Sequence, residues 1–184
     1  MPLKYNQGQR GMVVPNVLSR TYRYSSWQGN IVLKVTPKGR GAVTISINPT
    51  RRIAAAWRHI EKRCAAGKNC NRYFSSLHKG QTLSDILKNV TFTVHQLVPK
   101  PGVDIMKLPN ANSAGNDFAL SLWSFLADDA TKENTTEALA ATILHELAHY
   151  AGATTNPGAK NALEAENALL HCGLKRFFNP KAKG

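Results

Sequence analysis

The chain has 184 residues, 42% of them hydrophobic, which is enough apolar material for one domain with a real core and excludes an intrinsically disordered chain. No apolar run reaches the roughly 18 residues of a transmembrane helix, so the sequence predicts no membrane span. We expect a single domain over residues 1–184.

The formal net charge of +13 is unevenly distributed. Residues 1–100 contain 17 Lys and Arg against two acidic residues, whereas residues 101–184 contain seven against nine. The chain therefore has a basic N-terminal half, 1–100, and a nearly neutral half, 101–184, which carries the candidate chemistry. The basic half is suited to an anionic partner or an inhibitor protein, and a solvated basic surface is the equally acceptable alternative.

The N-terminal segment and the cysteines bear on the compartment. Met1–Arg20 lacks the continuous apolar segment of a Sec signal peptide, so we expect a protein that is cytoplasmic in its producer, exported by a non-Sec route, or present in mature form. Cys64 and Cys70 flank a short loop and could close a disulfide in an exported protein. Cys172 is expected to be a small buried residue at a helix end.

The first elements predicted in chain order are a hairpin and a helix. Residues 31–35 and 42–47 are rich in β-formers and flank a Pro- and Gly-containing turn, which predicts a hairpin. Asn48-Pro49 then begins a helix that Gly67 ends. Apolar residues recur at intervals of four, three and four along it, which predicts a buried stripe of Ile53, Trp57, Ile60 and Cys64.

The middle of the chain alternates regular and irregular segments. Residues 82–88 read as a short helix and residues 90–98 as a strand, in which His95 has a structural role. Residues 99–117 are rich in Pro, Gly and Asn and predict a long loop that forms a lid or one wall of a cleft. Residues 118–126 are apolar and predict another strand.

The chemistry is concentrated in His145-Glu146-Leu147-Ala148-His149, an H-E-x-x-H motif. Asn134-Thr-Thr-Glu137 reads as a capping box that opens a helix through the apolar run 138–151. On a helix, side chains four residues apart lie on one face, so both imidazoles can bind one metal ion, with Glu146 close enough to act on a water. Two solvated histidines on a surface helix are the alternative, but the apolar neighbours favour a buried helix.

A metal centre of this kind takes a third protein ligand, and Glu164, Glu166 and His171 are the candidates. A helix from Asn156-Pro157 to Gly173 places Glu166 in the middle of its apolar stripe and the other two candidates on the opposite face. A carboxylate on a buried face needs a partner, either a metal ion or a basic side chain. We predict Glu166 as the third ligand and keep Glu164 as the alternative.

H-E-x-x-H followed by a Glu on the next helix resembles the gluzincin pattern of zinc metallopeptidases. Gly152 extends the motif towards the metzincin pattern, but Thr155 stands where that family has its third ligand. No Asp follows Asp129, so an aspzincin ligand is also missing. The resemblance implies an α+β zincin-like domain with a small mixed β-sheet, an active-site helix, a C-terminal helix, and a strand before the active-site helix at the upper edge of the cleft.

The same resemblance implies a cofactor, roles and an activity. The cofactor is Zn²⁺ and its implied ligands are His145, His149 and Glu166. Glu146 is the implied general base, and Tyr150 and His171 are candidates for stabilising an oxyanion. The implied activity is peptide-bond hydrolysis on a protein or peptide substrate, and the C-terminal part of the chain is similar to some bacterial effector and toxin metalloproteases. Two alternatives stay open: a peptidoglycan amidase or endopeptidase with the same zinc site, and a basic nucleic-acid-binding protein with a structural metal site.

Overall fold

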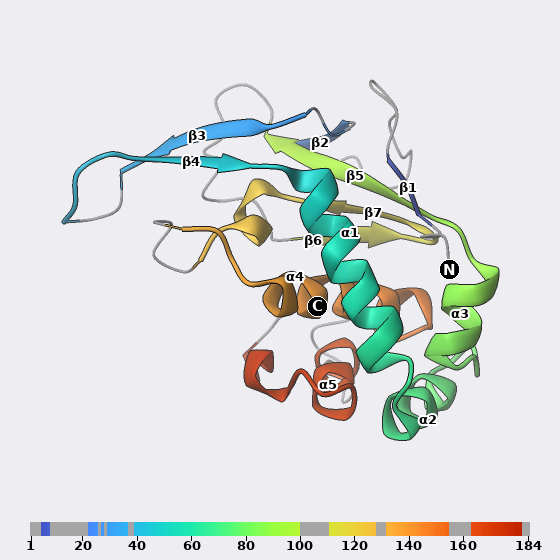
Figure 1. Cartoon of the computed structure of the whole chain (residues 1–184). Coiled ribbons are helices and arrows are strands. Elements are labelled where there is room, and N and C mark those ends of the chain that lie inside the picture. The colour runs from blue at the N-terminus through green and yellow to red at the C-terminus, as the bar shows by residue number, and fades with distance from the viewer. Residues whose placement is uncertain are drawn as a thin grey trace.

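The computed structural model describes residues 5–7, 22–25, 27, 29–36, 39–99, 111–127, 132–154 and 163–181. Its strands are β1 (Tyr5–Gln7), β2 (Tyr22–Ser25), β3 (Ile31–Val35), β4 (Val43–Ile47), β5 (Phe92–Pro99), β6 (Ala111–Ala114) and β7 (Asp117–Leu120). Its helices are α1 (Pro49–His59), α2 (Lys68–Ser76), α3 (Leu83–Asn89), α4 (Thr136–Tyr150) and α5 (Glu164–His171). The expected α+β class is confirmed (Figure 1), and no helix in this part of the chain is long and apolar enough to cross a membrane.

A mixed sheet forms one layer of the molecule. Among the described residues its strand order is β1-β5-β7-β6, and β2 also pairs with β5. The β1 and β7 strands run parallel to β5, whereas β6 runs antiparallel to β7 at the edge of the sheet. Separately, β3 and β4 form the predicted antiparallel hairpin, with Ile31 opposite Ile47 and Val35 opposite Val43.

Two predictions for the middle of the chain were wrong. The β6 strand lies inside residues 99–117, which the sequence predicted as loop, and the strand predicted over 118–126 ends at Leu120. Leu122–Phe125 forms a short 3₁₀ helix instead. Ala-Asn-Ser-Ala contains none of the β-branched or aromatic residues that mark strands, so only its backbone pairing with β7 reveals β6. The β6 strand is the sheet edge that packs against α4.

The predicted helix starts in the first half are confirmed. The Asn48 side chain accepts a hydrogen bond from the Arg51 N–H at 2.9 Å, and Pro49 occupies the first turn of α1. The helix continues through a π-helical turn, Ile60–Cys64, before Gly67. Its predicted apolar stripe is fully buried. Thr82 caps α3 by accepting from the Asp85 N–H at 3.0 Å.

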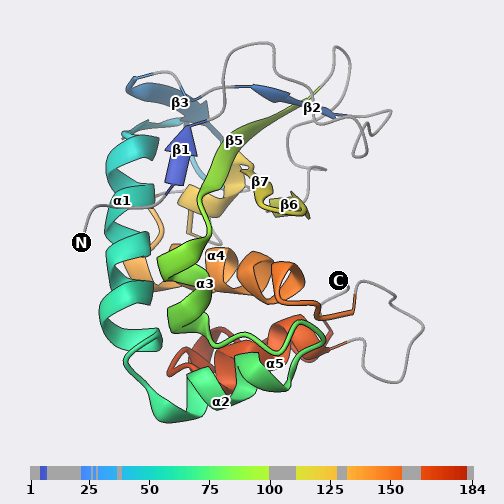
Figure 2. The same ribbon diagram turned by 90° about the vertical axis from the view of Figure 1, so that its right-hand side faces the viewer.

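Helix α4 is the central element of the helical layer. It lies between the sheet and α5, and α1 packs along its side (Figure 2). Trp57 of α1 packs against Phe92 of β5 and Phe118 of β7, with ring centroids 5.7 and 6.5 Å apart. This aromatic cluster fixes α1 against the sheet, because it fills the space between the layers with rigid side chains.

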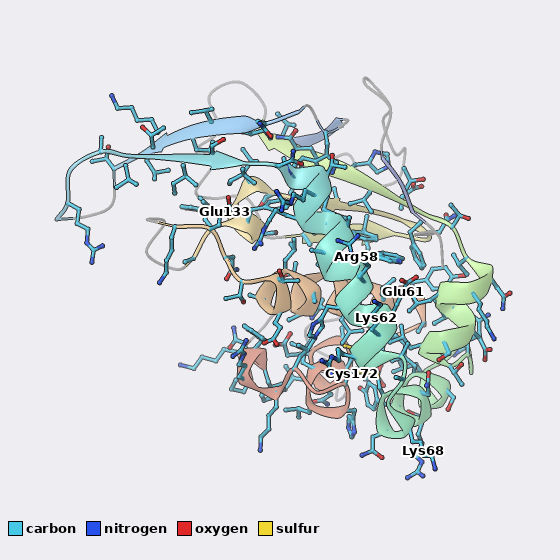
Figure 3. The ribbon with its side chains drawn as sticks, viewed as in Figure 1. Arg58, Glu61, Lys62, Lys68, Glu133 and Cys172 are labelled. Carbon is cyan, nitrogen blue, oxygen red and sulfur yellow. A yellow bond between two sulfur atoms is a disulfide. The ribbon has the colours of Figure 1, made fainter. Side chains whose placement is uncertain are left out.

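Part of the basic charge of the N-terminal half lies on the outer face of α1. Arg51 and Arg58 are exposed there, as is Lys62 on the π-helical turn that continues α1, and Figure 3 shows Arg58 and Lys62 beside Glu61. Arg52, in contrast, turns towards the second half of the chain, where its Nε lies 3.2 Å from the Glu133 carboxylate. The expected anionic partner or inhibitor protein stays a prediction.

The predicted Cys64–Cys70 disulfide was wrong. Cys70 of α2 is bonded to Cys172, which ends α5, and Cys64 is a buried free thiol. The two bonded cysteines are 102 residues apart, so only the packing of α2 against α5 brings them together. Closing a loop of this length stabilises the fold by about 4–5 kcal/mol in the chain-entropy description.

Counting accessible thiols tests this pairing. Burial raises the pKa of the Cys64 thiol to about 11, so the native protein should not react with a maleimide at neutral pH. Unfolding without reductant should expose one reactive thiol, at Cys64, and unfolding with reductant should expose all three. Mass spectrometry of the labelled peptides is the measurement. Label on Cys172 without reductant would contradict the Cys70–Cys172 bond.

Candidate metal centre

The helix that carries the H-E-x-x-H motif begins one residue later than the capping box predicts. Its N-cap is Thr135, whose Oγ1 accepts from the Ala138 N–H at 3.1 Å, and Asn134 accepts from the Thr135 N–H at 3.0 Å. Glu137 contacts Arg176 instead of closing the capping box. The helix start is therefore tied by side chains to its own backbone and to the C-terminal segment.

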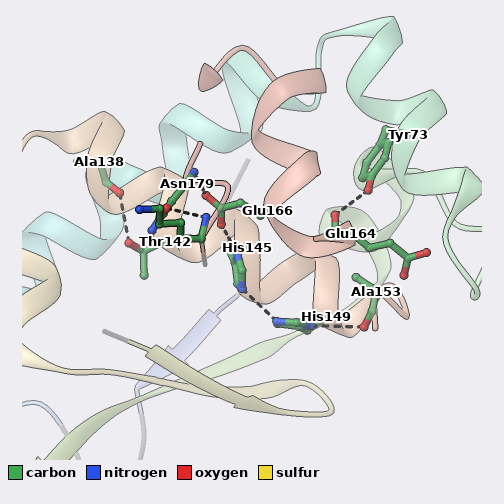
Figure 4. A network of polar contacts seen from close by, with 10 residues as sticks. Tyr73, Ala138, Thr142, His145, His149, Ala153, Glu164, Glu166 and Asn179 are labelled. Atoms are coloured by element: carbon green, nitrogen blue, oxygen red, sulfur yellow. Dashed lines mark hydrogen bonds and ion pairs between the residues drawn. The ribbon is translucent and has the colours of Figure 1, made fainter. Parts of the chain in front are cut away.

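The two histidines of the motif converge through one nitrogen each. The Nε2 atoms of His145 and His149 lie 3.1 Å apart, with ring planes at 76° (Figure 4). The Nδ1 of His145 lies 2.9 Å from the Glu166 carboxylate, and the Nδ1 of His149 lies 3.4 Å from the carbonyl oxygen of Ala153. Carboxylates and carbonyls only accept, so each Nδ1 is the donor in its contact, and the neutral form of each ring has its lone pair on Nε2.

This arrangement fits a divalent metal ion. Two Nε2 atoms 3.1 Å apart need a cation between them, either a proton that one ring donates to the other or a metal ion bound to both. Two nitrogens bound at about 2.0–2.1 Å to one tetrahedral zinc ion are about 3.3 Å apart, close to the observed separation. Burial, followed by the nearby charge of His145, lowers the pKa of His149, so its neutral, metal-binding form is favoured.

Glu146 lies buried beside this pair. The residue is 7% exposed, and the side chain of Ser113 on β6 lies near enough to its carboxyl group to affect its pKa by hydrogen bonding. Burial raises the pKa of the Glu146 carboxyl, and the Ser113 hydrogen bond and the charge of His145 offset part of that rise. The edge strand of the sheet thus contacts the candidate general base directly.

Glu166 reaches the centre from α5. The described helix begins at Glu164, so the predicted start at Asn156-Pro157 lies outside the described residues, while the predicted stop at Gly173 is confirmed by its φ of +79°. Glu166 is buried as predicted, 6% exposed. Its partners are a ring nitrogen of His145 at 2.9 Å and the main-chain N–H of Asn179 at 2.6 Å. The carboxylate therefore sits on the side of the His145 ring away from His149.

Glu164, the alternative ligand, is held by other contacts. Its carboxylate accepts from the Thr154 N–H at 2.9 Å, and its carbonyl oxygen accepts from the Tyr73 hydroxyl at 2.6 Å. Burial, with the charge of Glu164 as a smaller cause, raises the pKa of Tyr73 to about 12. Among the described residues, no group of three or more His, Cys, Asp or Glu side chains is arranged to hold a metal ion.

The two predicted oxyanion residues point elsewhere. The Tyr150 ring packs edge-on against Phe92 at 5.1 Å and lies under the Lys79 ammonium at 3.6 Å. The His171 ring is exposed and stacks on Tyr73 at 4.4 Å, where α5 meets α2. These contacts join helices to each other and to the sheet, and we give neither residue a role in the chemistry proposed below.

Sequence reasoning missed two participants, Ser113 and Asn179. Ser113 belongs to a segment without strand character, so nothing in its composition placed it beside Glu146. Asn179 contributes its main-chain N–H, which every residue except proline has. No side-chain pattern could have indicated the second contact.

No protein-family model, curated protein or solved structure matches the chain.

Gly152 is the tightest position next to the centre, and its substitution gives a stability prediction. Its φ is +99°, and an added Cβ would lie 2.6 Å from the Cβ of His78. Gly152→Ala should therefore destabilise the fold by about 2–4 kcal/mol, from backbone strain plus the overlap. Gly80→Ala is the matched control, since Gly80 has a φ of +65° and open space, and it should cost about 1 kcal/mol. Urea unfolding followed by circular dichroism measures both, and equal losses would contradict the overlap.

Proposed function

We propose that this protein is a zinc-dependent metallopeptidase in which His145 and His149 hold the ion and Glu146 is the general base. The observation that carries the proposal is the convergence of the two Nε2 atoms, 3.1 Å apart, next to a buried carboxyl group. Bound there, zinc supplies a Lewis acid that polarises the scissile carbonyl and acidifies the attacking water.

Glu146 moves the proton. Its carboxylate oxygen takes a proton from the attacking water and later delivers it to the leaving nitrogen of the cleaved amide. Both steps need a group whose pKa is close to neutrality, and burial raises the pKa of Glu146 in that direction. The Ser113 side chain on β6 lies beside this carboxyl group, and its hydrogen bonding lowers the pKa of Glu146 and so offsets part of the rise.

The edge strand supports an extended peptide as the substrate. The β6 strand pairs with β7 on one side and is the last strand of the described sheet on its other side. Such an edge binds an added strand through main-chain hydrogen bonds, which suits a protein substrate of varied sequence. Because Ser113 belongs to β6 and contacts Glu146, a peptide added there would lie beside the base. A mixed sheet above an H-E-x-x-H helix also supports a zincin-like fold.

The disulfide supports a place of action outside a reducing cytosol. Disulfides such as Cys70–Cys172 persist in oxidising compartments and are rare in cytosolic proteins. We therefore extend the proposal to an exported hydrolase, in keeping with a bacterial effector or toxin that is delivered to its target.

The test combines zinc content with hydrolysis. Elemental analysis should find about one zinc per wild-type chain, and His145→Ala or His149→Ala should lose it. Glu146→Gln should keep the zinc but lower peptide hydrolysis by roughly 10²–10⁴-fold, because it removes only the proton carrier. Glu61→Gln, the same change in the Ile60–Cys64 turn outside the centre, should keep both properties.

Unfolded proteins and purified peptidoglycan serve as parallel substrates. If the protein cleaves peptidoglycan and not unfolded proteins, peptidoglycan replaces protein as the proposed substrate, and the zinc-dependent hydrolysis stays as proposed. Wild-type turnover by Glu146→Gln, or a wild-type protein that binds no zinc, would refute the proposal.

A further inference from the structure

The second carboxyl group at the centre, that of Glu166, is engaged at both of its oxygen atoms. Oε2 lies 2.9 Å from the Nδ1 of His145, and Oε1 accepts from the main-chain N–H of Asn179 at 2.6 Å (Figure 4). The side chain is buried, so these two donors replace the water it has lost.

The direction of these contacts separates Glu166 from the ligand position. The two nitrogens of an imidazole ring point outwards on different sides, and the Nε2 of His145 is the one that faces His149. An oxygen bonded to Nδ1 is therefore on the far side of the ring from an ion held between the two Nε2 atoms. This is the arrangement of a carboxylate that orients a metal-binding histidine, fixes its tautomer and raises its basicity.

The partner on the other oxygen belongs to a different part of the chain. Asn179 follows the 3₁₀ turn Lys175–Phe177, and its side chain accepts from the Lys181 N–H at 3.0 Å, which shapes the turn that presents its own N–H. This C-terminal segment, residues 172–181, is fixed at its start by the Cys172 disulfide and in its middle by the contact of Arg176 with Glu137 on α4. It is therefore an ordered part of the wall around Glu166.

We propose that Glu166 is a positioning residue rather than a zinc ligand, and that it couples the C-terminal segment to the metal affinity of His145. The inference rests on the proposed zinc site. It replaces the sequence prediction of Glu166 as third ligand, so among the described residues His145 and His149 are the two side chains assigned to the ion. The Asn179 N–H holds the carboxylate in place, the carboxylate holds the Nδ1 proton of His145, and the Nε2 lone pair is thereby aimed at the ion.

Three roles for Glu166 predict different results. A ligand that is removed lowers zinc stoichiometry and changes the coordination environment of the metal. A positioning residue that is removed leaves the ligand set intact but weakens affinity by about 10–100-fold. A carboxylate that only satisfies the Asn179 N–H affects folding stability and leaves metal affinity as it is.

The first experiment compares wild type, Glu166→Ala and Glu166→Gln. Zinc affinity is measured by competition with a chromophoric chelator, and the coordination sphere by the visible spectrum of the Co²⁺-substituted protein. Glu166→Ala should still take up one metal per chain but bind it about 10–100-fold more weakly, with the Co²⁺ bands unmoved. Glu166→Gln keeps an oxygen that can accept from Nδ1, so its loss should be smaller.

The second experiment acts on the C-terminal segment without touching any side chain of the centre. Asn179→Pro removes the main-chain N–H, and the preceding Phe178 is already extended, as a residue before proline prefers. It should weaken zinc affinity several-fold. Asn179→Ala is the matched control, because it loses the side-chain contact but keeps the N–H, and it should bind zinc like wild type.

The outcomes are distinguishable. Loss of metal from Glu166→Ala, or shifted Co²⁺ bands in Glu166→Gln, would make Glu166 a ligand and overturn the inference. Wild-type affinity in Glu166→Ala would overturn it in favour of a purely structural carboxylate. If Glu166→Ala does not fold, Asn179→Pro decides alone, and wild-type affinity there refutes the coupling. A wild-type protein that binds no zinc refutes the proposed function itself.

Discussion

The facing Nε2 atoms of His145 and His149, 3.1 Å apart, are the constraint on which the rest of the centre depends. The i, i+4 spacing on α4 brings the two rings together, but spacing alone does not decide which nitrogen of each ring faces inwards. That choice comes from the acceptors behind the rings, Glu166 and the carbonyl of Ala153. Each holds a proton on Nδ1, and the two Nε2 atoms are left facing one another. A proton shared between them or a bound metal ion satisfies both.

The two buried carboxyl groups at the centre differ through their surroundings. Glu166 is saturated by the Asn179 N–H and the His145 ring, so its position is fixed. Glu146 is buried with a Ser113 hydrogen bond, and burial raises its pKa. A fixed carboxylate is suited to orientation, whereas a carboxyl group with a raised pKa is suited to moving a proton. The same chemical group thus fits two tasks, and the difference arises from neighbouring elements rather than from the residue type.

Features encoded locally were readable from the sequence. Apolar periodicity and capping residues predicted the β3–β4 hairpin, the start of α1, α3, and the start of the H-E-x-x-H helix to within a residue, and the stripe argument predicted that Glu166 is buried. Features that depend on distant partners were not. The β6 strand exists through pairing with β7, and the Cys70–Cys172 bond through packing of α2 on α5. Burial of Glu166 indicated that it needs a partner, but which nitrogen it meets follows from how α5 docks on α4.

The division of the sequence into a basic half and a neutral half does not correspond to a division of the core. Trp57 and Phe92 from the basic half pack with Phe118 from the other half, and β5 pairs with β7 across the same boundary. Helix α1 also packs on α4, so the basic half supports the helix that carries the metal centre. The helix that carries the exposed basic charge, α1, is therefore also the helix that packs against α4. Deleting the basic half would remove part of the core. Binding of an anionic partner to this half is therefore tested by substituting exposed basic residues, such as Arg58 and Lys62, which leaves the core intact.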